Sequence, residues 1–578
     1  MSDVASLGGA SLGGASLCRR DIALYPDLAP ALAELGRLQG ERRWLARALV
    51  GAPGLVAARI DLGVVLLGAG DAAGAARLLR GTLALEPGEA TAWFNLGVLR
   101  GSTPEAAEAY RRSLGLAAAA DAATNLADVL RDGESFLDAI PFYRRALSLV
   151  PALPTVIDSL AFLSSYDPQA KSEEIFRLNR RWGALQQRPE TRPVHSNPPE
   201  PARRLRIGYL SADLHDHPVG RNLVGLIEHH SQAVEAFFYA GREVDDRIQR
   251  RLKARAAGWR STAGLDDAAL VQAIRADDID LLVILAGHTA FNRLPIAAYR
   301  PAPVTVAMHD LTSSGLDEVD AVLGDAITMP EGGEERFTER IARLPSFYLH
   351  EPLPPVPIAP VPIVPGPIAP GPGAPLLLVS ANNPAKLNDR VIDLWIEILK
   401  RLPEARLLLK YRDRFGDPLI QRRWIGRAGL AGIGADRLLF RTGDEDLLSH
   451  LAVIGSADIA LDPFPFNGAT TTYEALWMGV PVVTCLGRRF VGRVAAAMLA
   501  TLDLPELIAA DEPGYLAAVL GLARDPGRRA RLRAGLRARL EASALLDAPA
   551  YARAVEAQYR LIWEEWCRRS KPDGGSRA

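Results

Sequence analysis

The spacing of hydrophobic residues divides the chain into an all-helical first part and a longer part in which strands and helices alternate. From about residue 25 to 170, Ala and Leu recur with helical periodicity and no strand pattern interrupts them. Leu62 and Leu96, each followed by Gly, are 34 residues apart, and Pro53 and Pro87 repeat this offset. Paired helices that stack through small residues have this period, so tetratricopeptide-like repeats are predicted; a generic helical bundle is the alternative.

After residue 203 the pattern changes to short apolar runs separated by helical stretches. RLRIGYLSAD, DIDLLVILAG and APVTVAM come first, and PLLLVSAN, ARLLLKY, DRLLFRTG, ADIALDPFP and PVVTCLG follow residue 375. Such runs are typical of parallel strands that are buried on both faces. Two doubly wound α/β lobes are therefore predicted, with ligands expected at the carboxyl ends of the strands.

A proline-rich stretch, residues 352–375, separates the two sets of strands and predicts an extended connector, because proline is excluded from inner strands and helix interiors. The expected organisation is a flexible N-terminus (1–24), TPR-like helical repeats (25–170), a connector (171–202), a first Rossmann-like lobe (203–351), the Pro-rich linker (352–375), a second Rossmann-like lobe (376–567) with an amphipathic closing helix at 551–566, and a disordered tail (568–578).

Composition narrows the class of protein. The chain has 67 basic and 68 acidic residues and a formal charge of −1, which argues against nucleic acid as an obligatory partner. Cys18, Cys485 and Cys567 are far apart and have no metal-binding spacing. The N-terminus lacks the basic and apolar regions of a signal peptide, and no run approaches the roughly 18 apolar residues of a membrane span. A cytoplasmic protein without a membrane partner is expected.

The stretch LDPFPFNGATTTYEALWMGVPVVT, residues 461–484, is a candidate anion site in the second lobe. A helix should begin at Thr470, where free backbone N–H groups and the helix dipole favour a phosphate. Thr470 and Thr471 add hydroxyl groups, and Gly468 allows close approach of the backbone. Glu474 lies one turn further on, where its carboxylate could accept from a ribose hydroxyl. The alternative is a helix that is merely well capped.

Lys386 lies in a second loop of this lobe, in SANNPAKLND, between a predicted strand and a predicted helix. A cation at this position could neutralise the charge that develops on a leaving diphosphate. Asn382 and Asn383 precede it. The alternative is a solvated surface lysine.

The first lobe offers groups for acid–base chemistry. In YLSADLHDHPVG, Asp213, His215, Asp216 and His217 follow a strand, and a histidine beside a carboxylate is suited to proton transfer near neutral pH. Two histidines at i,i+2 spacing with no third ligand are a weak zinc signal, so no metal is predicted. A second loop, LAGHTAFNRLP, follows another strand. Together the two loops supply the candidates for the substrate pocket: Asp213, His288, Thr289 and Arg293.

Four motifs together resemble the tetratricopeptide-linked O-GlcNAc transferase family, which includes SPINDLY-type proteins and bacterial relatives: RIGYLSADLHDHPVG, LAGHTAFNRLPIAAYRPAPV, NNPAKLNDRVIDLW and LDPFPFNGATTTYEALWMGVPVVT. The resemblance runs from about residue 55 to 567. It implies a GT-B glycosyltransferase that inverts the sugar, needs no metal or cofactor, and moves a sugar from a nucleotide donor to Ser or Thr of a protein held by the repeats. A UDP-sugar with a GlcNAc-like sugar is the favoured donor.

The resemblance also assigns roles to residues. It implies His217 near the reacting centre, Lys386 and Asn383 on the donor diphosphate side, Thr470 and Thr471 on the phosphates, Glu474 on the ribose, and His450 near the nucleotide base.

This chain departs from the family pattern at three places. MHDLTSSG (308–315) replaces a loop of the LGYPGT type, Ala469 replaces a histidine, and Leu447 replaces a lysine. These departures leave other interpretations open. They are a flagellin-type glycosyltransferase using a nonulosonic acid, fucose or hexose, a catalytically weak TPR scaffold that senses a nucleotide, and a GT-B enzyme acting on a glycan or lipid.

Overall fold

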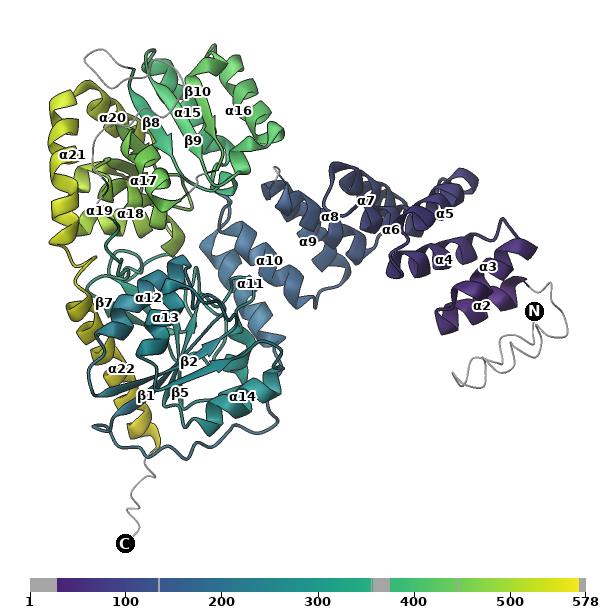
Figure 1. The fold of residues 1–578 in the computed structure, drawn as a ribbon, viewed down its shortest axis with the longest axis horizontal. Coiled ribbons are helices and arrows are strands. Elements are labelled where there is room, and N and C mark those ends of the chain that lie inside the picture. The colour runs from purple at the N-terminus through teal and green to yellow at the C-terminus, as the bar shows by residue number, and fades with distance from the viewer. Residues whose placement is uncertain (1–28, 134–135, 355, 357–374, 444–445, 571–578) are drawn as a thin grey trace, which may run out of the picture. The chain divides into compact units, whose positions relative to one another are not determined.

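The computed structural model describes residues 29–570 except 134–135, 355, 357–374 and 444–445 (Figure 1). The N-terminus expected at 1–24, nearly all of the Pro-rich stretch and residues 571–578 lie outside the described residues. The chain forms two compact units, and the second begins at Ile157.

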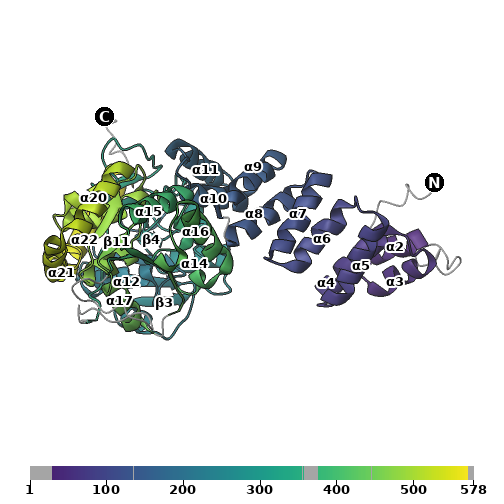
Figure 2. The same ribbon diagram turned by 90° about the horizontal axis from the view of Figure 1, so that it is seen from above.

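The first unit consists of helices that follow one another as stacked antiparallel pairs (Figures 1 and 2). The Leu-Gly repeat has a packing cause: a Cβ on Gly97 would lie 2.5 Å from the ring of Tyr110, and one on Gly63 would lie 3.3 Å from Leu79. The predicted small residues at helix crossings are therefore present. The helices are α2 (Ala29–Gln39), α3 (Arg42–Gly51), α4 (Val56–Gly68), α5 (Ala72–Leu85), α6 (Ala90–Arg100), α7 (Pro104–Leu116), α8 (Ala120–Asp132), η2 (Phe136–Ala139) and α9 (Ile140–Leu149).

The second unit begins earlier than the boundary expected at residue 170. Helix α10 (Pro154–Ser164) crosses into it, and the stretch expected as a connector contains helix α11 (Ser172–Ala184). Helix α11 is amphipathic and packs on the first lobe, where Gly183 lies against the backbone of Gly315 and Asn179 donates to the Thr312 hydroxyl at 3.1 Å. Burial of its apolar face explains why this segment is not a loose connector.

The first lobe is a seven-stranded parallel sheet in the order β3-β2-β1-β4-β5-β6-β7. Helices cover it, and its strands are mostly apolar, as the short buried runs predict. Its elements are β1 (Leu205–Ser211), α12 (Pro218–Glu228), β2 (Val234–Ala240), α13 (Arg247–Ala254), β3 (Gly258–Ser261), α14 (Asp267–Ala276), β4 (Leu281–Leu285), η3 (Leu294–Tyr299), β5 (Val304–Met308), β6 (Ala321–Asp325) and β7 (Arg340–Leu344).

The second lobe repeats this topology with six parallel strands in the order β10-β9-β8-β11-β12-β13. In both lobes the strand order reverses beside the first strand, between β1 and β4 and between β8 and β11, which is where doubly wound folds bind ligands. The strands are β8 (Leu377–Ser380), β9 (Arg406–Lys410), β10 (Leu438–Arg441), β11 (Ile459–Leu461), β12 (Val482–Cys485) and β13 (Ile508–Ala509). The helices are η4 (Pro384–Lys386), α15 (Asp389–Arg401), η5 (Arg414–Gly416), α16 (Pro418–Leu430), η6 (Ala435–Arg437), α17 (Leu447–Gly455), α18 (Thr470–Trp477), η7 (Phe490–Gly492), α19 (Val494–Thr501), η8 (Pro505–Leu507), α20 (Glu512–Arg524) and α21 (Pro526–Glu541).

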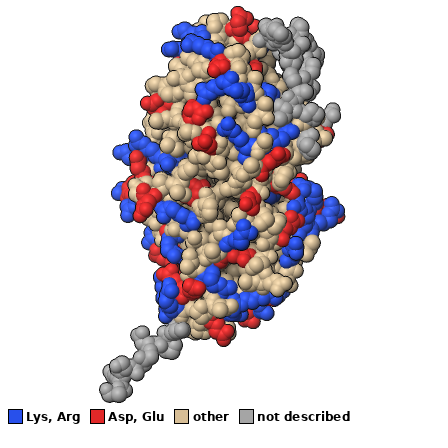
Figure 3. Space-filling model, turned by 90° about the vertical axis from the view of Figure 1, so that its left-hand side faces the viewer, with Lys and Arg blue, Asp and Glu red and all other residues tan. Residues whose placement is uncertain are grey.

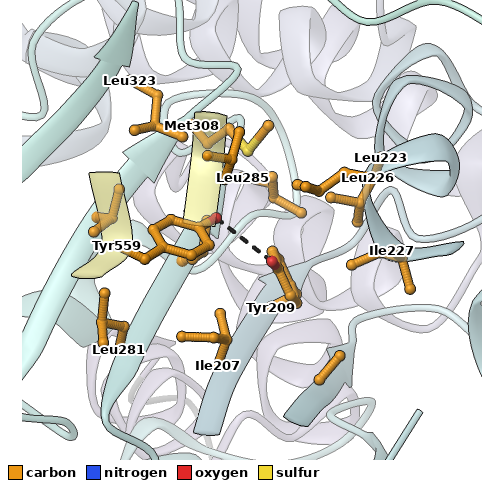
Figure 4. Packing of buried hydrophobic residues seen from close by; sticks show 14 of the residues in the cluster. Ile207, Tyr209, Leu223, Leu226, Ile227, Leu281, Leu285, Met308, Leu323 and Tyr559 are labelled. Carbon is orange, nitrogen blue, oxygen red and sulfur yellow. Dashed lines mark hydrogen bonds between the residues drawn. The ribbon is translucent and has the colours of Figure 1, made fainter. Parts of the chain in front are cut away.

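The predicted fold class, helical repeats followed by two Rossmann-like lobes, is confirmed, but the closing helix belongs to the other lobe. Helix α22 (Ala548–Ser570) packs on the first lobe, not on the second, and it includes residues 568–570 of the expected tail. Tyr559 and Trp563 are buried in the core of that lobe. The Tyr559 and Tyr209 hydroxyls lie 3.5 Å apart (Figure 4). The chain therefore crosses between the lobes twice.

Charge on the surface is mixed. On the face that carries α21 and α22, basic and acidic side chains are interspersed (Figure 3). No helix in the described part of the chain is long and apolar enough to cross a membrane. Within those same residues, no group of three or more His, Cys, Asp or Glu side chains is arranged to hold a metal ion.

Because α22 packs on the first lobe, a substitution on its buried face should lower the free energy of unfolding much more than one on its exposed face. Trp563→Ala leaves a cavity in the core and should lower the free energy of unfolding by about 3–5 kcal/mol. Leu561→Ala is the matched control, because Leu561 is 51% exposed, and its effect should stay within about 0.5 kcal/mol. Denaturant unfolding followed by tryptophan fluorescence measures both. Equal effects would contradict the packing of α22 on the first lobe.

Candidate active site

A cavity of about 390 Å³ lies between the two lobes. Its wall on the first lobe is the start of α12 and part of α13, and its wall on the second lobe is the start of α17 and α18. The segment His350–Pro354, which leads from one lobe to the other, forms a third side. This volume is within the usual range for small-ligand sites. Thr470 is the predicted donor-binding residue that lines it.

The turn before α18 is organised by the buried carboxylate of Asp462. This carboxylate accepts from the backbone N–H of Gly468 at 2.7 Å and from the Thr484 hydroxyl at 2.7 Å. A Cβ at Gly468 would lie 2.7 Å from the hydroxyl oxygens of Thr471 and Thr472. Gly468 is thus required for this tight turn, but its own N–H is already used within the protein.

Helix α18 begins without a side-chain cap, because Ala469 occupies the N-cap position. The N–H groups of the first helical turn therefore rely on another acceptor, and an anion in the adjacent cavity is suited to that role. The Thr471 hydroxyl donates to the Oδ1 atom of Asn382 at 3.0 Å, which ties α18 to the loop after β8. Of the two predicted phosphate-binding threonines, Thr470 faces the cavity and Thr471 is bonded inside the lobe.

Lys386 lies at the end of η4, in the same corner of the second lobe. Its Nζ atom donates to the Asn467 carbonyl at 2.6 Å and lies 4.4 Å from the centre of the Phe466 ring. Burial lowers the pKa of Lys386, and the nearby charge of Asp462 partly opposes this effect. Asn383 caps η4 by accepting from the N–H of Ala385 at 3.1 Å. The Lys386 ammonium is therefore bonded to the turn that immediately precedes the uncapped start of α18.

His450 and Glu474, predicted for the base and the ribose of a nucleotide, contact each other directly. The Nε2 atom of His450 lies 3.0 Å from the Glu474 carboxylate. On the other side, the ammonium of Lys410 contacts Nδ1 of His450. An ammonium can only donate, so Nδ1 accepts and Nε2 carries the proton that is donated to Glu474. Lys410 was not predicted, although a lysine at the end of an apolar strand, in ARLLLKY, was a visible signal.

His217 caps the start of α12 on the first lobe, and the cavity lies beside it. Its Nδ1 atom accepts weakly from the N–H of Val219 at 3.4 Å and lies 3.8 Å from the Asp213 carboxylate. Burial lowers the pKa of His217; the charge of Asp213 raises it in part, and His215 lowers it further. A neutral imidazole beside a carboxylate is equipped to accept a proton.

Asn292 connects the two loops of the first lobe. Its amide nitrogen donates to Asp213 at 3.1 Å and to the Thr289 hydroxyl at 2.8 Å, and its oxygen accepts from Ser211 at 2.8 Å. Asp213 and Thr289 are therefore held in one network, with Thr289 donating to the Ala286 carbonyl at 2.8 Å.

His288 and Arg293, both predicted to line the substrate pocket, are engaged by other groups of the protein, His288 partly by helix α10. The two ring nitrogens of His288 face the Asp158 carboxylate at 2.8 Å and the Ser313 carbonyl at 3.2 Å, so both donate. Burial alone would lower the pKa of His288, but the bond to Asp158 and the charge of Asp310 raise it to about 9. Arg293 pairs with Asp267 and donates to the Leu265 carbonyl. The two residues hold loops together and present no unengaged group to a ligand.

Two Rossmann-like lobes with a cavity between them define the GT-B class of fold, and in this chain helical repeats precede the two lobes. The family profile described as glycosyl transferase family 41 matches residues 187–351 and 372–555, more than half of the chain. The chain therefore belongs to glycosyl transferase family 41.

Known relatives agree with this assignment. The probable UDP-N-acetylglucosamine–peptide N-acetylglucosaminyltransferase SPINDLY of Oryza sativa subsp. japonica is 28% identical over 436 residues, 74% of this chain and 46% of the relative. Its Solanum lycopersicum counterpart is 30% identical over 414 residues, 70% of this chain and 43% of the relative. The chain thus spans under half the length of these relatives. A solved structure of an O-GlcNAc transferase mutant from Thermobaculum terrenum is 32% identical, with a TM-score of 0.72, and covers 89% of this chain and 98% of its own.

The crowding around Gly468 predicts that adding one methyl group here destabilises the second lobe. Gly468→Ala should lower the melting temperature, because the new Cβ would displace the hydroxyls that close the turn. Gly426→Ala is the matched control: Gly426 lies inside α16, and a Cβ at this position would have nothing within 4 Å, so it should stabilise by about 0.5–1 kcal/mol. Differential scanning calorimetry compares them. A Gly468→Ala protein as stable as the parent would contradict the described turn.

Proposed function

We propose that the protein transfers a sugar from a nucleotide-sugar donor to Ser or Thr hydroxyls of a protein acceptor, with inversion at the sugar and without a metal ion or other cofactor. The main supporting observation is that the uncapped start of α18 and the start of α12, which His217 caps, line the same cavity. Lys386 is bonded to the Asn467 carbonyl in the turn that leads into α18. The names of the relatives support a peptide acceptor. We infer that the helical repeats bind this acceptor.

In the proposed reaction, the acceptor oxygen bonds to the anomeric carbon from the face opposite the diphosphate. The bond between that carbon and the phosphate oxygen breaks, and the nucleoside diphosphate leaves. The charge that develops on it is stabilised by the first-turn N–H groups of α18, by the Thr470 hydroxyl and by the Lys386 ammonium. For this, Lys386 exchanges its bond to the Asn467 carbonyl for one to the diphosphate.

The hydroxyl proton is assigned to His217, directly or through a water. The neutral imidazole can take the proton, and Asp213 stabilises the imidazolium that forms. Asn292 holds Asp213 in place for this purpose. Glu474, His450 and Lys410 are proposed to hold the nucleoside, which requires the Glu474 carboxylate to exchange its hydrogen bond with the His450 ring for one with the ribose.

A UDP-sugar with a GlcNAc-like sugar is the favoured donor, because the relatives are named for UDP-N-acetylglucosamine. The cavity wall includes Leu447, an apolar side chain, at the start of α17. Because the family pattern has a lysine at this position, donors with other bases and sugars should be tested as well, including GDP-fucose, UDP-hexoses and activated nonulosonic acids.

Donor binding predicts thermal stabilisation of the purified protein by one group of sugar nucleotides. A ligand at 100 times its Kd should add about 2.7 kcal/mol to the free energy of unfolding. Lys386→Ala should weaken binding by about 10–100-fold, the value of a lost charge-assisted hydrogen bond. Lys400→Ala, at an exposed position near the end of α15, is the control and should bind like the parent. The proposal fails if no sugar nucleotide stabilises the parent protein.

The pairing of Asp213 with His217 predicts how kcat/KM varies with pH. Activity should rise with pH as His217 loses its proton and should level off above its depressed pKa. Asp213→Asn removes a charge that raises this pKa, so the acidic limb should move to lower pH. His217→Ala should lower kcat/KM by about 10²–10⁴-fold with little effect on donor binding. Asp245→Asn, 85% exposed, serves as control. An unmoved acidic limb in Asp213→Asn would exclude His217 as the titrating group.

A further inference from the structure

Lys386 has an unusual environment for an ammonium that is proposed to bind an anion. It is partly buried, its hydrogen-bond acceptor is a neutral carbonyl, and the charged group that acts on it is Asp462, itself buried. Burial favours the neutral amine, which cannot neutralise a diphosphate. An additional interaction that prefers the charged form is therefore valuable at this position.

The face of the Phe466 ring supplies such an interaction. The Nζ atom lies 4.4 Å from the ring centre, within the range in which an aromatic quadrupole attracts a cation. This attraction acts on the ammonium and not on the neutral amine, and it is strongest where water is scarce. Phe466 also directly precedes Asn467, whose carbonyl accepts from Lys386. One short turn thus holds the lysine in two ways.

The Phe466 ring is itself held by a residue from outside the lobe's own sheet. Tyr166, two residues beyond the end of α10, stacks on it with ring centres 4.5 Å apart and an interplanar angle of 27°. Tyr166 is buried, at 8% exposure. The same end of α10 is clamped by the buried Arg489, which donates to the carbonyls of Ser164 at 2.9 Å, Ser165 at 3.3 Å and Asp167 at 3.2 Å.

We propose that Phe466, held by Tyr166, is a positioning residue that keeps the Lys386 ammonium charged and directed at the donor diphosphate. The end of α10 then supports the donor site from behind the turn after β11, through the contact of Tyr166 with Phe466. The role in donor binding rests on the proposed function, but the contact between the Phe466 ring and the Lys386 ammonium can be tested without a donor. The titratable groups around this lysine are Asp462 on the turn after β11 and Tyr166 behind the ring.

The decisive measurement is the titration of Lys386 itself. The chain holds six lysines, Lys171, Lys253, Lys386, Lys400, Lys410 and Lys571, so protein carrying ¹³C at lysine Cε gives few signals, and Lys386→Met identifies the relevant one. Phe466→Leu keeps an apolar side chain and removes the ring. It should lower the pKa of Lys386 by about 0.5–1, the value of one cation–π contact. Phe466→Trp restores a ring face and should restore the pKa.

A control substitution and a second pair of variants distinguish the loss of the Phe466 ring from a general loss of structure. Phe440→Leu makes the same substitution elsewhere in the lobe, where Phe440 stacks on Phe415, and should leave the Lys386 signal unchanged. Tyr166→Leu should act in the direction of Phe466→Leu, whereas Tyr166→Phe keeps the ring and should be neutral. Melting temperatures of all variants are compared first, and if Phe466→Leu does not fold, the pair of Tyr166 variants decides.

The affinity of the protein for UDP, and for inorganic pyrophosphate as a probe that lacks a base, is then measured as a function of pH. This measurement tests whether the charge on Lys386 matters for binding the donor diphosphate. The affinity of the parent protein should fall as pH rises through the Lys386 pKa. In Phe466→Leu this fall should begin at lower pH, so that near the parent's Lys386 pKa the variant binds about three- to tenfold more weakly. An unchanged Lys386 titration in Phe466→Leu, or no recovery in Phe466→Trp, overturns the inference. If the parent binds neither probe nor any sugar nucleotide, the proposed function fails, and the NMR titration still decides the role of Phe466.

Discussion

The buried carboxylate of Asp462 is the constraint on which the second lobe's site depends. Removing a carboxylate from water is costly unless it is fully hydrogen-bonded. Here the Gly468 N–H and the hydroxyls of Thr484 and Thr472 satisfy it, and the Lys386 charge lies nearby. These bonds fold residues 462–469 into the turn that delivers the uncapped start of α18 to the cavity. Burial still raises the pKa of Asp462 to about 7, and these hydrogen bonds oppose that effect. The anion site is therefore a consequence of how a buried carboxyl group is accommodated.

The cavity depends equally on how the two lobes are joined. The segment after β7 stays attached to both: Glu351 pairs with Arg247 of the first lobe, and its carbonyl accepts from the Tyr473 hydroxyl of α18 at 2.8 Å. The ring of Tyr473 stacks on His350 with centres 4.1 Å apart. Helix α22 returns to complete the core of the first lobe. The two crossings place the start of α12 and the start of α18 on one cavity, which neither lobe provides alone.

The sequence does not reveal whether a polar side chain near a strand end faces a ligand or is hydrogen-bonded within the protein. His288 and Arg293 follow a strand end, where pocket residues are expected, yet each is fully hydrogen-bonded within the protein: His288 to Asp158 of α10 and to Ser313, and Arg293 to Asp267. Asn292, in the same loop, organises Asp213 and Thr289. Lys410 fixes the tautomer of His450 from the end of β9, which is remote from His450 in the sequence. Each of these roles is set by a hydrogen-bond partner that is remote in sequence.

The sequence by itself determined the local elements. The 34-residue period and the small residues at helix crossings predicted the paired helices, the short apolar runs predicted the parallel strands, and the threonines after Asn-Gly marked the start of α18. These features depend on bonds and burial within one or two turns, which a residue pattern records. Only the tertiary structure decided that α22 belongs to the first lobe, that α11 packs on it, and that Tyr166 stacks against Phe466. Such pairings join residues up to hundreds of positions apart, and many apolar faces are compatible with any one helix, so the pattern of a segment leaves its partner open until the whole chain is packed.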